Sequence, residues 1–168
     1  MSKISASTED KEAPVGVAVI VTFEGVRRYR DVLLSMRWSA VCLDEGQKIK
    51  NPEADVTIAC KALPCSHRII LSGTPIQNSL RELWSLFDFV FPGRLGTLMT
   101  FESEFSVPIR QGGYSGATKL QAEIAVRTAT TLQNIIRPYL LRRRQEDVVD
   151  SIRLPDKTEQ VRARDRMQ

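Results

Sequence analysis

Short apolar runs alternate with segments of helical periodicity along this chain, and this alternation restricts the fold more than any other feature. Each run is continuous and rich in β-branched residues, which is typical of strands that are buried on both faces of a sheet. The three runs lie at 17–22, 40–43 and 68–71. Each is followed by a segment in which apolar residues recur every three or four positions. Strand and helix repeated in this order predict an α/β fold with a parallel sheet.

The helical segments have recognisable beginnings and ends. We expect them at about 26–36, 53–63, 79–90 and 117–136. Ser79 and Glu82 form a capping box, because their side chains can pair with each other's unbonded backbone amides. The apolar stripe that follows is predicted to be core; it consists of Trp84, Leu86, Phe87 and Phe89. Between about 96 and 116 we predict loops with one short helical piece at 101–105.

Composition excludes several classes of protein. The 168 residues suit one domain or part of one, and 42% hydrophobic with 26% charged residues exclude a largely disordered chain. No apolar run is long enough to span a membrane. The three cysteines, Cys42, Cys60 and Cys65, form no CxxC pair, so we expect buried reduced thiols and no disulfide partner or zinc site. The net charge of +4 permits a nucleic-acid partner without requiring one.

Two polar clusters follow the second and third predicted strands. Asp44 and Glu45 come after one strand, and the turn Ser72-Gly73-Thr74-Pro75 comes after the other. Ligands of open α/β sheets bind beyond the carboxyl ends of the strands, where both clusters are expected to lie. One carboxylate can hold Mg²⁺ through water while its neighbour orients an attacking water in phosphoryl transfer. The alternative is that both clusters are ordinary solvated turns.

Five longer patterns occur in a fixed order. They are Leu43-Asp44-Glu45-Gly46-Gln47, Ile49-Lys50-Asn51-Pro52, the run from Arg68 to Asn78, the run from Leu83 to Phe89, and Tyr139-Leu140-Leu141-Arg142-Arg143. In this order they closely resemble the SNF2 branch of helicase superfamily 2, and the resemblance covers about 18–161. Within that branch, 105–109 and 112–115 look most like the Cockayne syndrome group B type of transcription-coupled repair translocase.

The resemblance implies roles for the polar clusters. Asp44 and Glu45 match the family's Walker B acids, the first for Mg²⁺ and the second for activating water. The turn from Ser72 to Pro75, with Gly73 and Thr74, matches motif III, which links the state of the nucleotide to DNA contacts. Gln47 departs from the His that many relatives carry. Either side chain can hydrogen-bond to the Ser72 turn, so we place Gln47 with the catalytic residues.

The resemblance also suggests DNA contacts. Thr22 lies in a stretch like a backbone-contacting motif, and Lys50 and Asn51 lie in a second segment near DNA. Arg142 and Arg143 match positions near the junction of two ATPase lobes. Nearby acidic residues favour the alternative of a solvated, self-paired helix face for these arginines. The single histidine, His67, is interpreted as a residue at the start of a strand, because no partner for ligation or proton transfer is evident.

The expected organisation is a partial RecA-like lobe with three α/β/α layers and a mainly parallel sheet. We expect a disordered leader at 1–14, the partial SNF2 N-terminal ATPase lobe at 15–154, and at 155–168 a linker toward a missing second lobe. No Gly-Lys dipeptide occurs in the chain, so the phosphate-binding Walker A loop is absent and tight ATP binding is not expected.

The resemblance implies that the parent family uses ATP and Mg²⁺ as cofactors. It also implies duplex DNA as a partner, with chromatin or RNA polymerase as further candidates, and a nuclear location. The leading hypothesis is part of a DNA-dependent ATPase that acts in transcription-coupled repair or chromatin remodelling. The alternatives are a non-catalytic lobe that binds DNA or protein, and a truncated product that is not stable because a sheet edge and an apolar face are left open.

Overall fold

The computed structural model describes residues 16–73 and 79–143. Strands β1 (Trp38–Leu43) and β2 (Cys65–Ile70) form a parallel pair in which Leu43 lies opposite Ile70. Helix α3 (Asp55–Ala62) crosses between them, as parallel pairing requires. The predicted α/β class with a parallel sheet is therefore confirmed, and the two strands occupy the positions expected for the second and third apolar runs.

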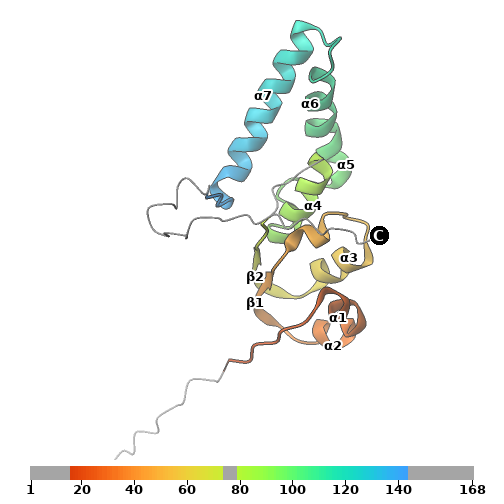
Figure 1. Ribbon diagram of the computed structural model, residues 1–168, viewed down its shortest axis with the longest axis vertical. Helices are drawn as coiled ribbons and strands as arrows, with labels where there is room; N and C mark the ends of the chain where they lie inside the picture. The colour runs from red at the N-terminus through yellow and green to blue at the C-terminus, as the bar shows by residue number, and fades with distance from the viewer. Residues whose placement is uncertain (1–15, 74–78, 144–168) are drawn as a thin grey trace, which may run out of the picture.

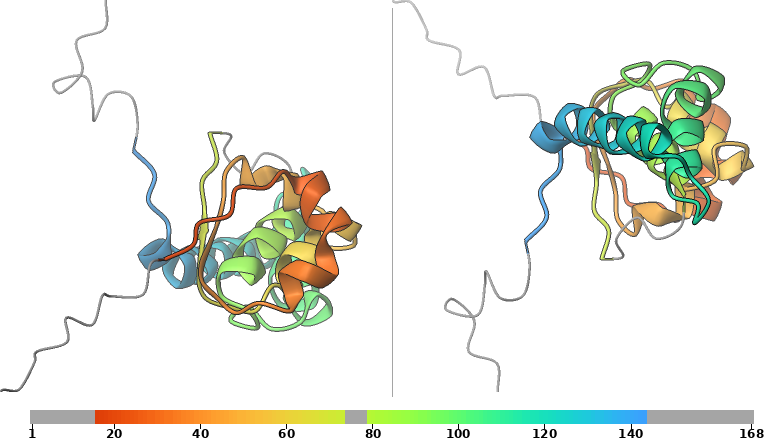
Figure 2. Two further views of the ribbon diagram at one scale, coloured as in Figure 1. Left: turned by 90° about the horizontal axis from the view of Figure 1, so that it is seen from below. Right: turned by 90° about the horizontal axis from the view of Figure 1, so that it is seen from above.

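The helices that accompany the sheet lie on one of its faces (Figure 2). Helices α1 (Phe23–Arg28), α2 (Arg30–Leu34) and α3, with the 3₁₀ turn η1 (Gly46–Ile49), form what we call the α/β part together with the strands. On the opposite face of the sheet, Ile69 of β2 and Leu71, which directly follows β2, are 51% and 53% exposed. Among the described residues, the structure thus contains two of the three expected layers, namely the sheet and the helices on one of its faces.

A second region, the helical extension, rises from the α/β part in Figure 1. It contains α5 (Leu98–Phe101), the π-helix η2 (Glu102–Ser106), α6 (Val107–Gly112) and the long α7 (Lys119–Ile136). The short η3 (Arg137–Tyr139) closes it at Pro138. No helix among residues 16–73 and 79–143 is long and apolar enough to cross a membrane.

Helix α4 (Leu80–Val90) belongs to two hydrophobic cores at once. Phe89 packs in the core of the α/β part with Val26, Leu33, Leu43, Ile49, Ala59, Cys60 and Leu63. Leu83, Trp84 and Phe87 pack in the core of the extension with Leu95, Phe101 and Leu132. The predicted core stripe on this helix is confirmed, with Leu86 half-buried against the first core. Ser79 caps the helix by accepting the Glu82 backbone amide at 3.2 Å.

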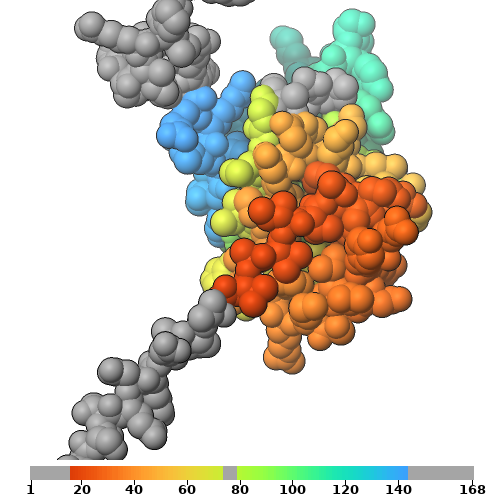
Figure 3. Space-filling view, turned by 60° about the horizontal axis from the view of Figure 1, so that its bottom comes forward, coloured from red at the N-terminus to blue at the C-terminus, as the bar shows by residue number. Residues whose placement is uncertain are grey.

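The strand predicted at 17–22 is wrong. In the structure these residues form no strand, and they lie on the surface at the start of the described chain (Figure 3, red). Val17 is 82% exposed and Ile20 is fully exposed. The β-branched composition favours extended backbone, but a strand also needs a partner for its ladder, and the sheet of the described residues holds only β1 and β2.

The helical extension also differs from the prediction of loops between 96 and 116. Pro108 and the Gly112-Gly113 pair suggest breaks, yet helix runs almost without interruption from Leu98 to Gly112. Pro108 lies in the first turn of α6, where its missing amide is tolerated. The π-helix η2 precedes it and carries the chain into that turn. The predicted helix at 26–36 is likewise two helices, because Tyr29 leaves helical geometry and ends α1.

The cysteines do not share one environment. Cys60 is buried as predicted, whereas Cys65 is half-buried and Cys42 is exposed on the open face of β1. Burial raises the pKa of the Cys60 thiol from 9.0 to about 11. The prediction of buried thiols therefore fails for Cys42, because the face of the sheet to which it points has no helix over it in the described residues.

Candidate functional site

The two polar clusters predicted from the sequence begin side by side, at the carboxyl ends of β1 and β2. The backbone amide of Leu71 donates to the carbonyl of Leu43 at 2.8 Å, and the carbonyl of Leu71 accepts the amide of Gly46 at 2.9 Å. In a regular parallel ladder, one residue bonds two partners that are two positions apart. Here the partners are three apart, so the chain carries one extra residue in the turn directly after β1, and we call this turn the bulge. Asp44 and Glu45 lie in this bulge.

The backbone of Glu45 adopts an unusual conformation for a residue with a side chain. Its φ and ψ are 54° and 45°, in the left-handed region, and it is the one described non-glycine residue with positive φ. This conformation costs about 1 kcal/mol for an L-residue. The Glu45 amide donates to Oδ1 of Asp44 at 2.9 Å. Bulges and left-handed residues of this kind are concentrated at functional sites, where they re-aim side chains.

A chain of hydrogen bonds joins the two clusters. Nε2 of Gln47 donates to Oε2 of Glu45 at 2.6 Å, and Oγ of Ser72 donates to Oε1 of Gln47 at 2.8 Å. The sequence prediction that Gln47 reaches the Ser72 turn is confirmed by this contact. The amide side chain therefore holds the Glu45 carboxylate in a fixed relation to the end of β2. Gly73 follows Ser72 in the chain, whereas Thr74 and Pro75 fall outside the described residues.

The exposed pair of carboxylates suits a metal that keeps most of its own water. Asp44 and Glu45 are both exposed, and no group of three or more metal-ligating side chains occurs among the residues that the structure describes. Mg²⁺ is commonly bound through one or two carboxylates, with water and substrate phosphate completing its shell. The Asp44 carboxylate fits that pattern, and a cage made only of protein ligands is not present in this part of the chain.

The residues predicted to contact DNA are exposed, and three of them, Thr22, Lys50 and Asn51, make local contacts. Oγ1 of Thr22 accepts the Gly25 amide at 3.1 Å and caps α1. Lys50 pairs with Glu82 at 3.5 Å, and Oδ1 of Asn51 accepts the Glu53 amide at 3.1 Å. Arg142 and Arg143 follow η3 and are exposed. Lys50 and Asn51 thus lie together beside the N-terminal end of α4.

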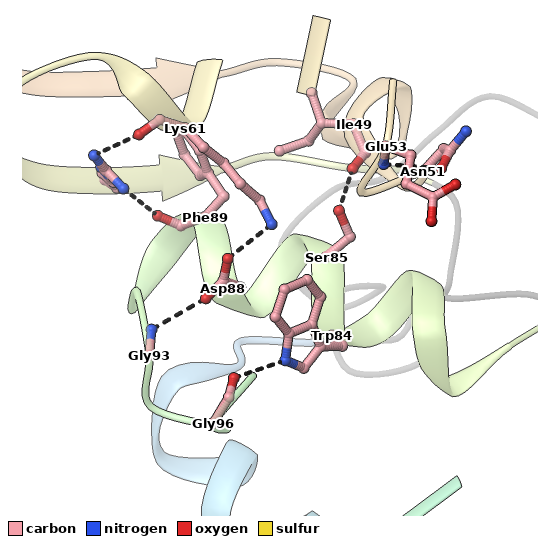
Figure 4. A network of polar contacts seen from close by, with 11 residues as sticks. Ile49, Asn51, Glu53, Lys61, Trp84, Ser85, Asp88, Phe89, Gly93 and Gly96 are labelled. Atoms are coloured by element: carbon pink, nitrogen blue, oxygen red, sulfur yellow. Dashed lines mark hydrogen bonds and ion pairs between the residues drawn. The ribbon is translucent and has the colours of Figure 1, made fainter. Parts of the chain in front are cut away.

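A buried serine on α4 fixes the segment that carries Lys50. Oγ of Ser85 on α4 donates to the carbonyl of Ile49 at 2.8 Å, and both residues are completely buried. Figure 4 shows this contact between the helix and the turn. The exposed Lys50 therefore directly follows Ile49, a buried residue that is hydrogen-bonded to α4. The sequence offered one weak signal for this contact, namely a serine between two large apolar residues, Trp84 and Leu86.

A second polar network was not foreseen from the sequence. Arg68 on β2 donates to the carbonyls of Lys61, Leu63 and Phe89 at 3.1, 2.9 and 3.2 Å. It therefore satisfies carbonyl groups at the C-terminal ends of both α3 and α4. A weak signal existed, because Arg68 and Ile70 are two positions apart in a predicted strand and therefore share one face of the sheet.

The same network contains a half-buried ion pair. Nζ of Lys61 lies 2.8 Å from Oδ2 of Asp88 and 4.5 Å from the centre of the Trp84 ring. Oδ1 of Asp88 accepts the Gly93 amide at 3.0 Å, and Nε1 of Trp84 donates to the Gly96 carbonyl at 3.2 Å (Figure 4). Together with the Arg68 contacts, they fix β2, α3 and α4 to one another.

The single histidine lies apart from this network. His67 is the third residue of β2, and its Nδ1 lies 3.0 Å from the carbonyl of Ser39 on β1. The side chain thus contacts the neighbouring strand near the beginning of the sheet, at the end opposite to the bulge. This position agrees with the interpretation of His67 as a residue near the start of a strand.

Similarity to known proteins shows the class to which this protein belongs. Residues 5–165 match the SNF2-related domain, and the chain belongs to that family. The chain is 54% identical over 143 residues to the Homo sapiens DNA excision repair protein ERCC-6. The aligned residues cover 85% of this chain and 10% of that protein. It is 53% identical over 143 residues to the DNA excision repair protein CSB of Oryza sativa subsp. japonica, covering 85% of this chain and 12% of that protein.

A solved structure with the same fold is the Sulfolobus solfataricus SWI2/SNF2 ATPase core in complex with dsDNA. The TM-score is 0.56 at 36% sequence identity, over 72% of this chain and 23% of that one. The family and the Cockayne syndrome group B type resemblance predicted from sequence are both confirmed. The chain spans about a tenth of the length of the repair proteins that it matches.

Proposed function

We propose that this chain carries the Mg²⁺- and water-positioning half of the ATP site of a DNA-dependent translocase that acts in nuclear DNA repair. The observation that supports this most directly is the path from Glu45 through Gln47 to Ser72, because it links the two family motifs at one edge of the sheet. We extend the proposal to transcription-coupled repair, with chromatin or RNA polymerase as partners, on the resemblance of the motifs to the Cockayne syndrome group B type.

Each side chain has a definite task in this proposal. Asp44 would hold Mg²⁺ through water, and the bound ion supplies neutralisation of charge on the phosphates. Glu45 would orient the attacking water and receive its proton. Gln47 keeps the Glu45 carboxylate from turning toward bulk water, because its amide donates to that carboxylate. Ser72, with the turn of Gly73, Thr74 and Pro75, would pass a change at this carboxylate on toward the DNA-facing segments.

DNA would be held through its phosphates. Lys50, Asn51, Thr22, Arg142 and Arg143 are exposed, and contacts of such residues with phosphates set affinity without reading sequence. Lys50 is favourably placed because the Ser85 contact to Ile49 fixes the turn that carries it.

Phosphate release from ATP, with and without duplex DNA, tests the catalytic half of the proposal. The purified chain is expected to show no turnover above that of Glu45→Gln, since its sequence contains no Gly-Lys phosphate loop. DNA-stimulated turnover that Glu45→Gln abolishes would support the role of Glu45 and contradict inactivity of the isolated chain. Turnover that is indifferent to Glu45→Gln and Asp44→Asn would contradict both assigned roles.

A non-catalytic binding module is the second candidate, and the missing phosphate loop favours it. Fluorescence anisotropy with labelled duplex DNA tests it. Affinity should fall steeply between about 50 and 200 mM salt, and Lys50→Ala should lower the salt slope by about one. A matched control is Lys119→Ala, at the start of α7 in the helical extension. No binding at about 50 mM salt would rule out the DNA-binding form of this module.

A further inference from the structure

The bulge at the end of β1 depends on Ile70, an aliphatic residue of β2 to which no role has been assigned so far. Gly46 is buried directly against Ile70 of β2, and a Cβ at position 46 would lie 2.2 Å from Cγ2 of Ile70. The φ of Gly46 is not positive, so its backbone would accept alanine. Space alone therefore demands glycine here, and the branched side chain of Ile70 is what occupies that space.

The position of Ile70 explains why the extra residue is placed where it is. Ile70 lies opposite Leu43, and it packs against the core of the α/β part. Its neighbour Leu71 forms the two hydrogen bonds that bracket the bulge, to Leu43 and to Gly46. With Gly46 pressed against Ile70 and bonded to Leu71, the additional length of chain must be taken up by Asp44 and Glu45.

We propose that Ile70 is a positioning residue for the two acids: its β-branch, by fixing Gly46, holds the bulge and the left-handed backbone of Glu45. In a regular strand, successive side chains point to opposite faces of the sheet. The bulge re-aims the second acid so that Gln47 can hold it toward the end of β2. This inference rests on the proposed function, in which Asp44 and Glu45 act on one Mg²⁺-bound nucleotide.

The test uses the complete chain, with two readouts. One is the sign of φ at Glu45, from backbone NMR couplings. The other is Mn²⁺ titration, followed by broadening of the amide signals of residues 44–47. Gly46→Ala and Ile70→Ala should each shift the Glu45 backbone away from positive φ and weaken Mn²⁺ binding at least three-fold. The double variant should recover to within two-fold of the wild type, because the methyl group introduced at position 46 then fills the space that the Ile70 side chain vacated.

Two further substitutions isolate the β-branch and keep the test usable where Ile70→Ala does not fold. Ile70→Val keeps Cγ2 and should behave as the wild type, whereas Ile70→Leu keeps the volume, loses that methyl group, and should behave as Ile70→Ala. Ile69→Ala, on the open face of β2, is the matched control and should change neither readout.

The outcomes separate this inference from the proposed function. Single variants that leave both the Glu45 φ and Mn²⁺ binding unchanged would overturn the role of Ile70. Loss in the singles without recovery in the double would also overturn it, since direct contact between the two positions would then not be the cause. If Mn²⁺ broadens no signal in the wild type, the metal role of Asp44 fails, and the φ measurement alone still decides the role of Ile70.

Discussion

The α/β part and the helical extension are held together by different kinds of contact. In the α/β part, side-chain hydrogen bonds join elements far apart in the chain, such as Arg68 to Phe89 and Ser85 to Ile49. Within the helices of the extension, side-chain hydrogen bonds join residues three or four apart, as between Thr118 and Gln121, and apolar packing joins the helices to one another. The long-range bond there, from Arg94 to the Tyr139 hydroxyl, measures 3.5 Å. Long-range polar contacts fix relative positions more precisely than apolar packing does. They occur in the region that carries the predicted catalytic residues.

Removing the long-range polar contacts should damage the α/β part most. Arg68→Met leaves three carbonyl groups without their donor, and we expect a loss of about 3 kcal/mol of unfolding free energy at about 1 kcal/mol each. Urea denaturation measures the loss, and amide hydrogen exchange should place it in β2, α3 and α4.

The matched control for Arg68 lies on α7. The side chain of Arg127 forms a long ion pair with Glu123, at 3.8 Å, and is 83% exposed. Arg127→Met should therefore cost less than about 0.5 kcal/mol. Equal losses from the two substitutions would contradict the contrast between the regions.

The extension should be most sensitive to backbone spacing. A Cβ on Gly112 would lie 2.3 Å from Cβ of Ala125 and 2.6 Å from the Gln121 carbonyl oxygen on α7. Gly112→Ala should therefore push α6 from α7 and cost about 2 kcal/mol. Hydrogen exchange should increase in α6 and α7 but not in β1 and β2. Gly113→Ala is the control, since its new Cβ meets nothing closer than 3.5 Å; a similar loss there would mean that helix spacing is not the cause.

The buried thiol should give the α/β part its own pH dependence. Because burial raises the pKa of Cys60 from 9.0 to about 11, the folded state keeps a proton that the unfolded chain releases above pH 9. The stability linked to this proton is complete below pH 9 and is lost as pH rises toward 11. Between pH 8 and 10 the wild type should lose about 1.4 kcal/mol more than Cys60→Ala. Cys42→Ala should keep the wild-type profile, because Cys42 is exposed.

The smallest expected effect concerns the contact between η3 and the end of α4. The Tyr139 ring lies 4.4 Å from the centre of the Phe91 ring and 5.9 Å from that of Phe87. Tyr139→Leu should cost about 1 kcal/mol, measured by urea denaturation, and a double-mutant cycle with Phe91→Leu should recover most of that as coupling. Tyr114→Leu between α6 and α7, where Tyr114 is exposed, should be neutral. An absence of coupling would show that the exit of α7 is not fixed to α4 by these rings.

Elements that bury a continuous or periodic apolar pattern could be predicted from the sequence. Strands β1 and β2 and helices α4 and α7 were expected within a few residues of their observed bounds. The run at 17–22 has the same composition as a strand, but whether it pairs depends on a partner that composition does not encode. Helix through Pro108 was missed, because the π-helix before it depends on packing rather than on propensity.

Proximity in the candidate site could be predicted, whereas its local geometry could not. Parallel strands bring their carboxyl ends to one edge, so the closeness of Gln47 and Ser72 followed from topology. The left-handed backbone of Glu45 arises from the fit between Gly46 and Ile70, residues 24 positions apart (46 to 70) on different strands. Nothing in a local pattern distinguishes Ile70 from the other aliphatic residues of its strand.

Because α4 packs in both hydrophobic cores, it can accept few substitutions during evolution. Leu83, Trp84, Ser85, Phe87 and Phe89 are all buried, so the helix has little surface on which substitutions are free. Each buried apolar side chain must also fit its neighbours in one of the two cores. A compensating substitution in one core does not restore packing in the other. We infer that 80–90 should drift more slowly than α7, in which only Ala125 and Leu132 are buried.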